Sequence, residues 1–332
     1  MHAVPRDWPA LTVGITTRNR PESLARCLTS LAAFERSIAE VVVVDDSSDV
    51  PIDAELDGIP QSIREKLVLV NQPGRQGYIV ARNAIVRRAQ TAFVLMLDDD
   101  TVVRDGKAIA DAIDVLSDRA SIGAVGFAQA EGDGSPWPAS AQPSVADYPC
   151  LVPAFIGFAH LLRRDAFLAV GGYREAFYFY GEEKDFCLRL LDAGREVAYL
   201  PHARVVHLPD PEGRSPSRYL RQVIRNDCLG ALYNEPFPLP LATVPLRLFR
   251  YFRMRSHGRI ADAGGFAWIL RELAGQLPDV ARQRKPVRWA TLRRWRALRA
   301  LPERFDPSAV SIESSPAEER GDATRLANAD AE

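Results

Sequence analysis

The stretch Phe93-Val94-Leu95-Met96-Leu97-Asp98-Asp99-Asp100 decides the fold of this chain. Five apolar residues in a row predict a strand buried on both faces, and three carboxylates follow at its C-terminal end. Adjacent negative charges repel one another, so a compact structure needs a positive group beside them. A divalent cation fits, because hard oxygen ligands suit Mg²⁺ or Mn²⁺. A solvated acidic loop or a helix cap is the alternative interpretation.

Strand and helix signals alternate on either side of this stretch, which is the pattern of an α/β fold with a mostly parallel sheet and flanking helices. In such sheets ligands bind beyond the carboxyl ends of the strands, where the aspartates fall. The segment 129–150 predicts a long loop containing Trp137. Strands are expected at 11–16, 41–44, 67–70, 122–127, 155–162, 197–200 and 203–207. Helices are expected at 21–34, 79–89, 107–116, 165–170 and 181–194.

The 332 residues carry a net charge of −1, which shows no overall bias toward nucleic acid. The four cysteines form no CxxC pair, so neither a zinc knuckle nor a disulfide scaffold is indicated. Residues 1–7 lack the basic and apolar regions of a signal peptide, and no run of 18 apolar residues occurs. We therefore expect a cytoplasmic protein.

Beyond Pro209 the composition changes. Helix signals run from Ser215 to Tyr233, and residues 247–304 hold fifteen Arg or Lys against four acids. Interleaved arginine and aromatic residues predict either a peripheral contact with an anionic membrane or a mainly helical subdomain that packs on the sheet or forms an oligomer. From Asp306 the tail is acidic and is expected to be disordered.

Six segments, taken in order, resemble motifs of the family 2 glycosyltransferases, which have the GT-A fold and use nucleotide-sugar donors. The resemblance implies a catalytic domain over 1–210, with a nucleotide-sugar half at about 1–104 and an acceptor half at about 105–210. A helical basic region (211–305) and the tail (306–332) follow it. The segments are "VGITTRNRPESLARCLTSL" (13–31), "VVVVDDSSD" (41–49), "NQPGRQGYIVARNAIVRRA" (71–89), "VLMLDDDTVV" (94–103), "FYGEEKDFCLRLLDAG" (179–194) and "VAYLPHARVVH" (197–207).

The aspartate run corresponds to the metal motif of that family. The resemblance implies that Asp98, Asp100 and His207 hold a divalent cation, Mg²⁺ or Mn²⁺, with Asp100 the surer ligand and Asp98 turned toward the metal or the sugar-ribose. Asp98 and Asp100 project to the same side of an extended strand end, whereas Asp99 points away and orders the loop. For His207 the alternative is a core histidine bonded to backbone.

Nucleotide-sugar binding falls, by the same resemblance, to the first strand ends and the segments that follow them. Three of these residues have simpler interpretations: Arg82 as a surface helix charge, Asn83 as a buried cap and Gly157 as a bulge. The residues implied are Thr16, Arg18, Asp45, Asp46, Arg75, Arg82, Asn83, Asp98 and Gly157.

The late acidic motif implies the general base of an inverting transfer, which removes the proton of the acceptor hydroxyl. The base maps onto Glu183, while Glu182 stays open as an alternative and Asp185 is a further acceptor-side acid. The pair here is Glu-Glu where the family usually has Glu-Asp. Helix-dipole stabilisation by acids in a first turn is the simpler interpretation.

The expected activity is therefore that of an inverting glycosyltransferase of the hexosyl or deoxyhexosyl type. The donor is a nucleotide-diphospho-sugar and the acceptor a saccharide or a lipid-linked saccharide, in bacterial polysaccharide or cell-envelope assembly at the inner face of the membrane. A sugar-phosphate nucleotidyltransferase is a weaker alternative, because Gly14 stands alone and no glycine-rich phosphate loop follows the first strand. A catalytically silent scaffold is the non-enzymatic alternative.

Overall fold

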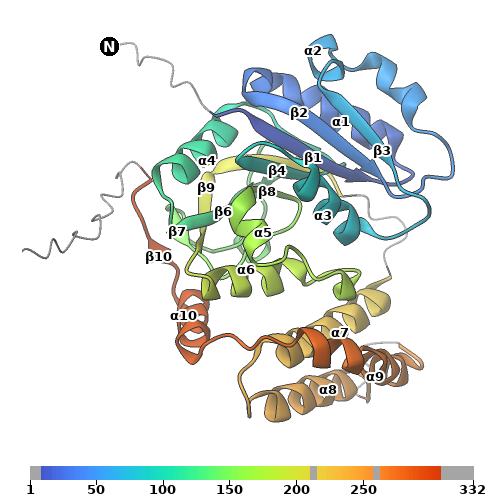
Figure 1. Cartoon of the computed structure of the whole chain (residues 1–332), viewed down its shortest axis with the longest axis vertical. Coiled ribbons are helices and arrows are strands. Elements are labelled where there is room, and N and C mark those ends of the chain that lie inside the picture. Colours follow the sequence, from blue (N-terminus) through green and yellow to red (C-terminus); the bar gives the residue numbers. More distant parts are fainter. Residues whose placement is uncertain (1–8, 210–214, 257–261, 308–332) are drawn as a thin grey trace, which may run out of the picture.

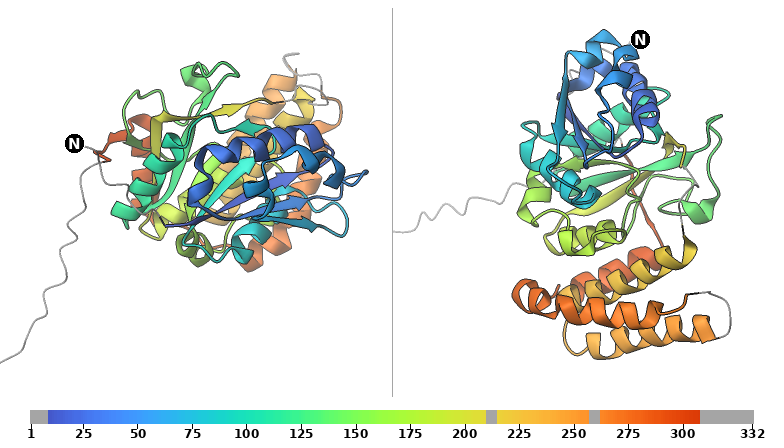
Figure 2. Two further views of the ribbon diagram at one scale, coloured as in Figure 1. Left: turned by 90° about the horizontal axis from the view of Figure 1, so that it is seen from above. Right: turned by 90° about the vertical axis from the view of Figure 1, so that its right-hand side faces the viewer.

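The computed structural model describes residues 9–209, 215–256 and 262–307. One ten-stranded sheet crosses the molecule, with helices on both faces and a separate helical layer at one end (Figures 1 and 2). The strands are β1 (Leu11–Thr17), β2 (Ile38–Asp45), β3 (Leu67–Asn71), β4 (Phe93–Asp98), β5 (Thr101–Val102), β6 (Ile122–Ala130), β7 (Cys150–Leu151), β8 (Ala159–Arg163), β9 (Glu196–His207) and β10 (Glu303–Arg304).

The helices follow the strands closely along the chain. The α-helices are α1 (Pro21–Ser30), α2 (Gln61–Arg64), α3 (Tyr78–Arg88), α4 (Lys107–Asp118), α5 (Arg164–Ala169), α6 (Glu182–Asp192), α7 (Pro216–Asn234), α8 (Pro240–Ser256), α9 (Gly265–Gln283) and α10 (Trp289–Ala300). The 3₁₀ turns are η1 (Leu31–Ser37), η2 (Asp53–Gly58), η3 (Ala139–Ala141) and η4 (Glu175–Phe177).

The sheet runs in the order β10-β7-β9-β6-β8-β4-β1-β2-β3, and β5 pairs with β9. Its longest ladders are parallel: β1 pairs with β2 and β4, β2 with β3, and β6 with β9. The mostly parallel α/β sheet is thus confirmed. Because β1, β2 and β4 run in the same direction, their carboxyl ends lie at one edge, where ligands of such sheets bind.

Both faces of the sheet are covered, which explains the continuous apolar runs in its strands. In β2, Val41 and Val43 join the core beneath α1 and α4, whereas Val42 and Val44 join the core beneath α3, α5 and α6. Gly14 lets α3 approach β1 closely, because a Cβ there would lie 2.4 Å from Ile85 Cγ2.

Two segments differ from the sequence expectation. The strand expected at 155–162 begins only at Ala159, because residues 157–158 form a turn in which the Gly157 carbonyl accepts from Arg82. The two short strands expected at 197–200 and 203–207 form the single strand β9, with a register shift opposite Phe127 and Ala128.

The C-terminal helices form the predicted helical region. Helices α7, α8 and α9 stack beyond α6 (Figure 1), and Tyr233, Tyr251 and Ile269 extend the second core into this layer. Helix α10 returns beside α6, and β10 then pairs with β7. Within the described residues, every helix is too short or too polar to cross a membrane. The predicted disorder of the acidic tail concerns residues of which 308–332 lie outside the described part of the chain.

Candidate active site

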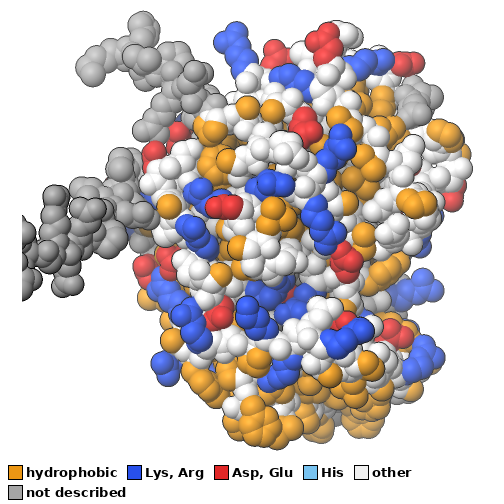
Figure 3. Space-filling view, in the orientation of Figure 1, with side chains coloured by type: hydrophobic (Ala, Val, Ile, Leu, Met, Phe, Trp, Pro, Cys, Tyr) orange, Lys and Arg blue, Asp and Glu red, His pale blue; other side chains and the backbone are white. Residues whose placement is uncertain are grey.

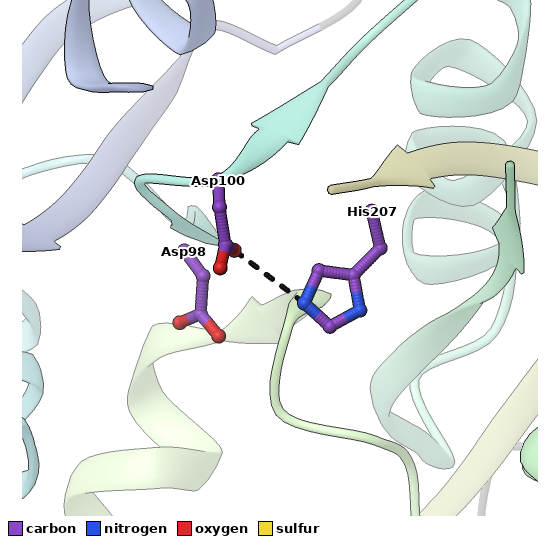
Figure 4. A group of neighbouring side chains, drawn as sticks. All are labelled: Asp98, Asp100 and His207. Carbon is purple, nitrogen blue, oxygen red and sulfur yellow. Dashed lines mark ion pairs between the residues drawn. The ribbon is translucent and has the colours of Figure 1, made fainter. Parts of the chain in front are cut away.

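The aspartate run ends β4 and meets the last residue of β9. Strand β5 pairs with β9, which sets Thr101 opposite His207, and the Asp100 carbonyl accepts from the Leu208 N–H at 2.8 Å. One ligand atom each of Asp98, Asp100 and His207 lies within 4.8 Å of the others. Figure 4 shows the three side chains facing one another, with His207 Nε2 3.4 Å from Asp100 Oδ1. Two carboxylates and an imidazole suit Mg²⁺ or Mn²⁺.

Asp99 belongs to the turn rather than to this group. Its carboxylate accepts from Thr17 Oγ1 at 2.8 Å and pairs with Arg20 Nη1 at 3.2 Å. Burial raises the pKa of Asp99 to about 7, although the charge of Arg20 opposes the shift. Asp99 therefore ties the turn after β4 to the end of β1, in line with the sequence expectation.

The imidazole of His207 is held by side chains, not by backbone as in the simpler interpretation. Its Nδ1 lies 2.7 Å from Oε1 of Gln129, whose amide nitrogen donates to the Ala141 carbonyl. Gln129 Oε1 must therefore accept, so Nδ1 carries a proton and Nε2 is the ring nitrogen that faces Asp100 and can serve as a metal ligand. The ring also stacks on Phe158 and Trp137, with centroids 5.0 and 5.5 Å away.

Arg82 lies at the centre of the site, not on the surface. Its guanidinium donates to Asp98 Oδ1 at 2.5 Å, to Glu182 Oε1 at 3.0 Å and to the Gly157 carbonyl at 2.9 Å. Burial alone lowers the pKa of Arg82, but the charges of Asp98 and Glu182 raise it above its ordinary value. The buried cation thus joins the metal-ligand group to the acidic motif.

Glu182 and Glu183 begin α6 but differ in their surroundings. Glu182 is 0% exposed and bound to Arg82, whereas Glu183 is half-buried. A Cβ added to Gly157 would lie 2.2 Å from Glu183 Oε1, so the glycine makes room for this carboxylate. Burial raises the pKa of both glutamates, and the positive charge of Arg82 opposes the shift in each.

Two residues predicted at the site are engaged elsewhere. The Asp185 carboxylate pairs with Arg174 at 3.0 Å and with Arg189 at 2.6 Å. Asn83 donates to the Tyr173 carbonyl at 2.8 Å and accepts from its N–H at 2.9 Å. Asp185 therefore links α6 to Arg174, and Asn83 links α3 to Tyr173 in the turn before η4. The acceptor-side role of Asp185 and the nucleotide-sugar role of Asn83 stay predictions from the resemblance.

Asp45 and Asp46 shape the loops at the end of β2. The Asp45 carboxylate accepts from the backbone N–H and hydroxyl of Ser48, at 3.1 and 2.6 Å. The Asp46 carboxylate accepts from the N–H groups of Gln76 at 2.6 Å and Gly77 at 3.0 Å. Asp46 therefore ties the loop before α3 to the sheet edge.

The remaining residues predicted for the nucleotide-sugar surround this edge. Thr16 is buried at the end of β1, in register with Asp98. Arg18 donates to the Ser47 carbonyl at 3.3 Å, and Arg75 is exposed in the loop between β3 and α3. Gln129, which orients His207, was not predicted, because it ends a buried strand outside every motif.

Two family models match the chain over this site. The model described as glycosyl transferase family 2 matches residues 12–171, and the model described as the N-terminal domain of galactosyltransferase matches residues 139–211. Together they span the aspartate run, the acidic motif and His207. The resemblance to the family 2 glycosyltransferases is thus confirmed over residues 12–171.

One curated relative and two solved structures resemble this chain. The pre-mycofactocin glycosyltransferase of Mycobacterium tuberculosis is 28% identical over 62% of this chain, which spans only 45% of that relative. The structure of GalNAc-T7 with UDP, GalNAc and Mn²⁺ has a TM-score of 0.55 and 17% identity, over 82% of this chain and 58% of that one. The mannosyltransferase PcManGT of Pyrobaculum calidifontis, with GDP-Man and Mn²⁺, has a TM-score of 0.52 and 18% identity. The match covers 90% of this chain and 81% of that one. The fold is GT-A.

Proposed function

We propose that this chain transfers a sugar from a nucleotide-diphospho-sugar to an acceptor hydroxyl by a metal-assisted inverting displacement. One observation carries the proposal: Arg82 joins Asp98, a member of the metal-ligand group, to Glu182 of the acidic motif. A donor side and an acceptor side thus share one buried cation. The structures that resemble this chain were solved with a nucleotide or nucleotide-sugar and Mn²⁺, which supports the same chemistry.

The donor side would be built by the first half of the domain, about 1–104, together with His207. Asp98, Asp100 and His207 would hold Mg²⁺ or Mn²⁺, which when bound neutralises charge on a departing nucleoside diphosphate. Gln129 keeps the His207 Nε2 lone pair available for this task. The nucleotide itself would lie along the ends of β1 and β2 and the loop before α3, bordered by Thr16, Arg18, Asp45, Asp46 and Arg75.

On the acceptor side, about 105–210, Glu183 is the general base. It accepts the proton of the acceptor hydroxyl while that oxygen bonds to the anomeric carbon and the bond from this carbon to the diphosphate oxygen breaks. Glu182 Oε1 is bound to Arg82, whereas Glu183 is a half-buried residue whose Oε1 lies beside Gly157. Burial raises the pKa of Glu183, and a raised pKa makes a carboxylate a better base.

The acceptor we propose is a saccharide, free or lipid-linked, in bacterial polysaccharide or cell-envelope assembly, with a hexosyl or deoxyhexosyl unit transferred. The deciding experiment incubates the chain with UDP- and GDP-sugars and Mn²⁺ and measures release of the nucleoside diphosphate. We expect release with at least one donor, and none after chelation or with Glu183→Gln. A chain that binds nucleotide-sugars yet releases nothing, with or without saccharide acceptors, is a scaffold instead.

A further inference from the structure

We infer that the outer face of α8 docks onto an anionic membrane surface. This α8 face consists of Leu241, Leu246, Phe249 and Phe252, all exposed, with exposed Phe237 just before the helix. Leu241, Phe249 and Phe252 follow the spacing that places residues on one side of a helix. Figure 3 shows hydrophobic side chains gathered at the lower end of the molecule, where Figure 1 places α8.

Packing within the chain accounts for only part of this apolar face: Phe252 contacts Phe266 of α9, with ring centroids 5.7 Å apart, yet it stays 48% exposed. Helix α8 uses the adjoining side for the core, where Tyr251 is fully buried and the partly buried Val244 and Leu248 pack beside it. The helix is therefore apolar on two sides, one turned to α7 and α9 and one turned to solvent. A large exposed side chain such as Phe249, 58% exposed among similar neighbours, marks an interaction surface.

The positive charges beside the α8 face indicate which kind of partner it fits. Residues 240–256 contain four arginines and no acid, and Arg250 and Arg253 are exposed next to the apolar side chains. An apolar helix face bordered by arginine matches a bilayer that offers acyl chains and anionic headgroups together. A symmetric pair of chains joined through this face would bring the same arginines together, which opposes self-association.

The test is co-sedimentation of the full chain with two kinds of vesicle, one of phosphatidylcholine and one of phosphatidylcholine with phosphatidylglycerol. We expect the chain to bind the anionic vesicles and to be released by salt. Phe249→Ser with Phe252→Ser should weaken binding by about tenfold or more, because two side chains no longer enter the bilayer. Arg250→Gln with Arg253→Gln should weaken binding to the anionic vesicles alone, by about fivefold per arginine.

Matched controls distinguish vesicle binding through the α8 face from non-specific binding by other exposed residues. Val50→Ser with Val145→Ser removes two exposed apolar side chains elsewhere, and Arg293→Gln with Arg296→Gln removes two exposed arginines of α10. Neither pair should change vesicle binding, and all variants should keep the thermal unfolding midpoint of the parent. Equal binding by the parent and the phenylalanine pair, or no binding by the parent, overturns the proposal. A dimer seen by analytical ultracentrifugation that the phenylalanine pair abolishes, without vesicle binding, assigns the face to a second copy instead.

Discussion

The aspartate run and the glutamate pair each hold negative charges next to one another, and in each group an arginine compensates part of that charge. In each, one carboxylate is buried against an arginine, Asp99 against Arg20 and Glu182 against Arg82. Arg20 also lies 3.3 Å from the neighbouring Asp100, but the other oxygen of Asp100 faces His207. Glu183, the neighbour of Glu182, lies beside Gly157. Adjacent acids in the cleft are thus not equivalent, because their other contacts differ: Asp100 faces Asp98 and His207, whereas Asp99 binds Thr17 and ties the turn to β1. Variants at these residues test whether neighbouring acids have different roles.

The largest effect is expected from Glu183→Gln. If Glu183 is the base, transfer should fall by about 10²–10⁴-fold, because the amide cannot accept the proton. Binding of the nucleotide-sugar, measured by calorimetry, should stay close to that of the parent. Glu182→Gln should bind nucleotide-sugar and keep measurable transfer. The opposite ranking of the two variants would exchange their roles.

Arg82→Met tests the buried cation that the two acidic groups share. It leaves the Glu182 carboxylate buried and uncompensated, so we expect the free energy of unfolding to fall by about 3–5 kcal/mol. Urea denaturation measures the loss. The double variant Arg82→Met with Glu182→Leu should recover much of it, since both charges are then absent. No recovery in the double variant would mean that Arg82 stabilises the fold mainly through Asp98 and Gly157.

Asp100→Asn and Asp99→Asn compare neighbours within the aspartate run. Loss of a ligand carboxylate should weaken Mn²⁺-dependent binding of a nucleoside diphosphate by about 10–100-fold, as calorimetry would show. Asp99→Asn should leave this affinity within about twofold, because the Asp99 carboxylate binds Thr17 and lies outside the group formed by Asp98, Asp100 and His207. Equal losses in the two variants would contradict different roles for Asp99 and Asp100.

Much of this arrangement was predictable because it is local in sequence. Apolar runs such as Val41–Val44 identified the buried strands, and the motif resemblance assigned Asp98, Asp100 and His207 to one group. The partners of Arg82 were not predictable, since Glu182 lies 100 residues away and meets it only through packing. The bond between Asn83 and the Tyr173 carbonyl was not predictable for the same reason, since the two residues lie 90 positions apart.

The smallest effect concerns the pH dependence of transfer. A base acts only when deprotonated, so kcat/KM should fall as the pH drops through the pKa of Glu183. Burial raises that pKa above the ordinary glutamate value of 4.5, with Arg82 opposing the shift, so the midpoint of the acid limb should lie above 4.5. The acid limb of the kcat/KM profile should persist in Glu182→Gln, because this variant retains the Glu183 carboxylate. If the acid limb disappears in Glu182→Gln, Glu182 is the base. A carboxylate that is buried and bound to an arginine could then still act in catalysis.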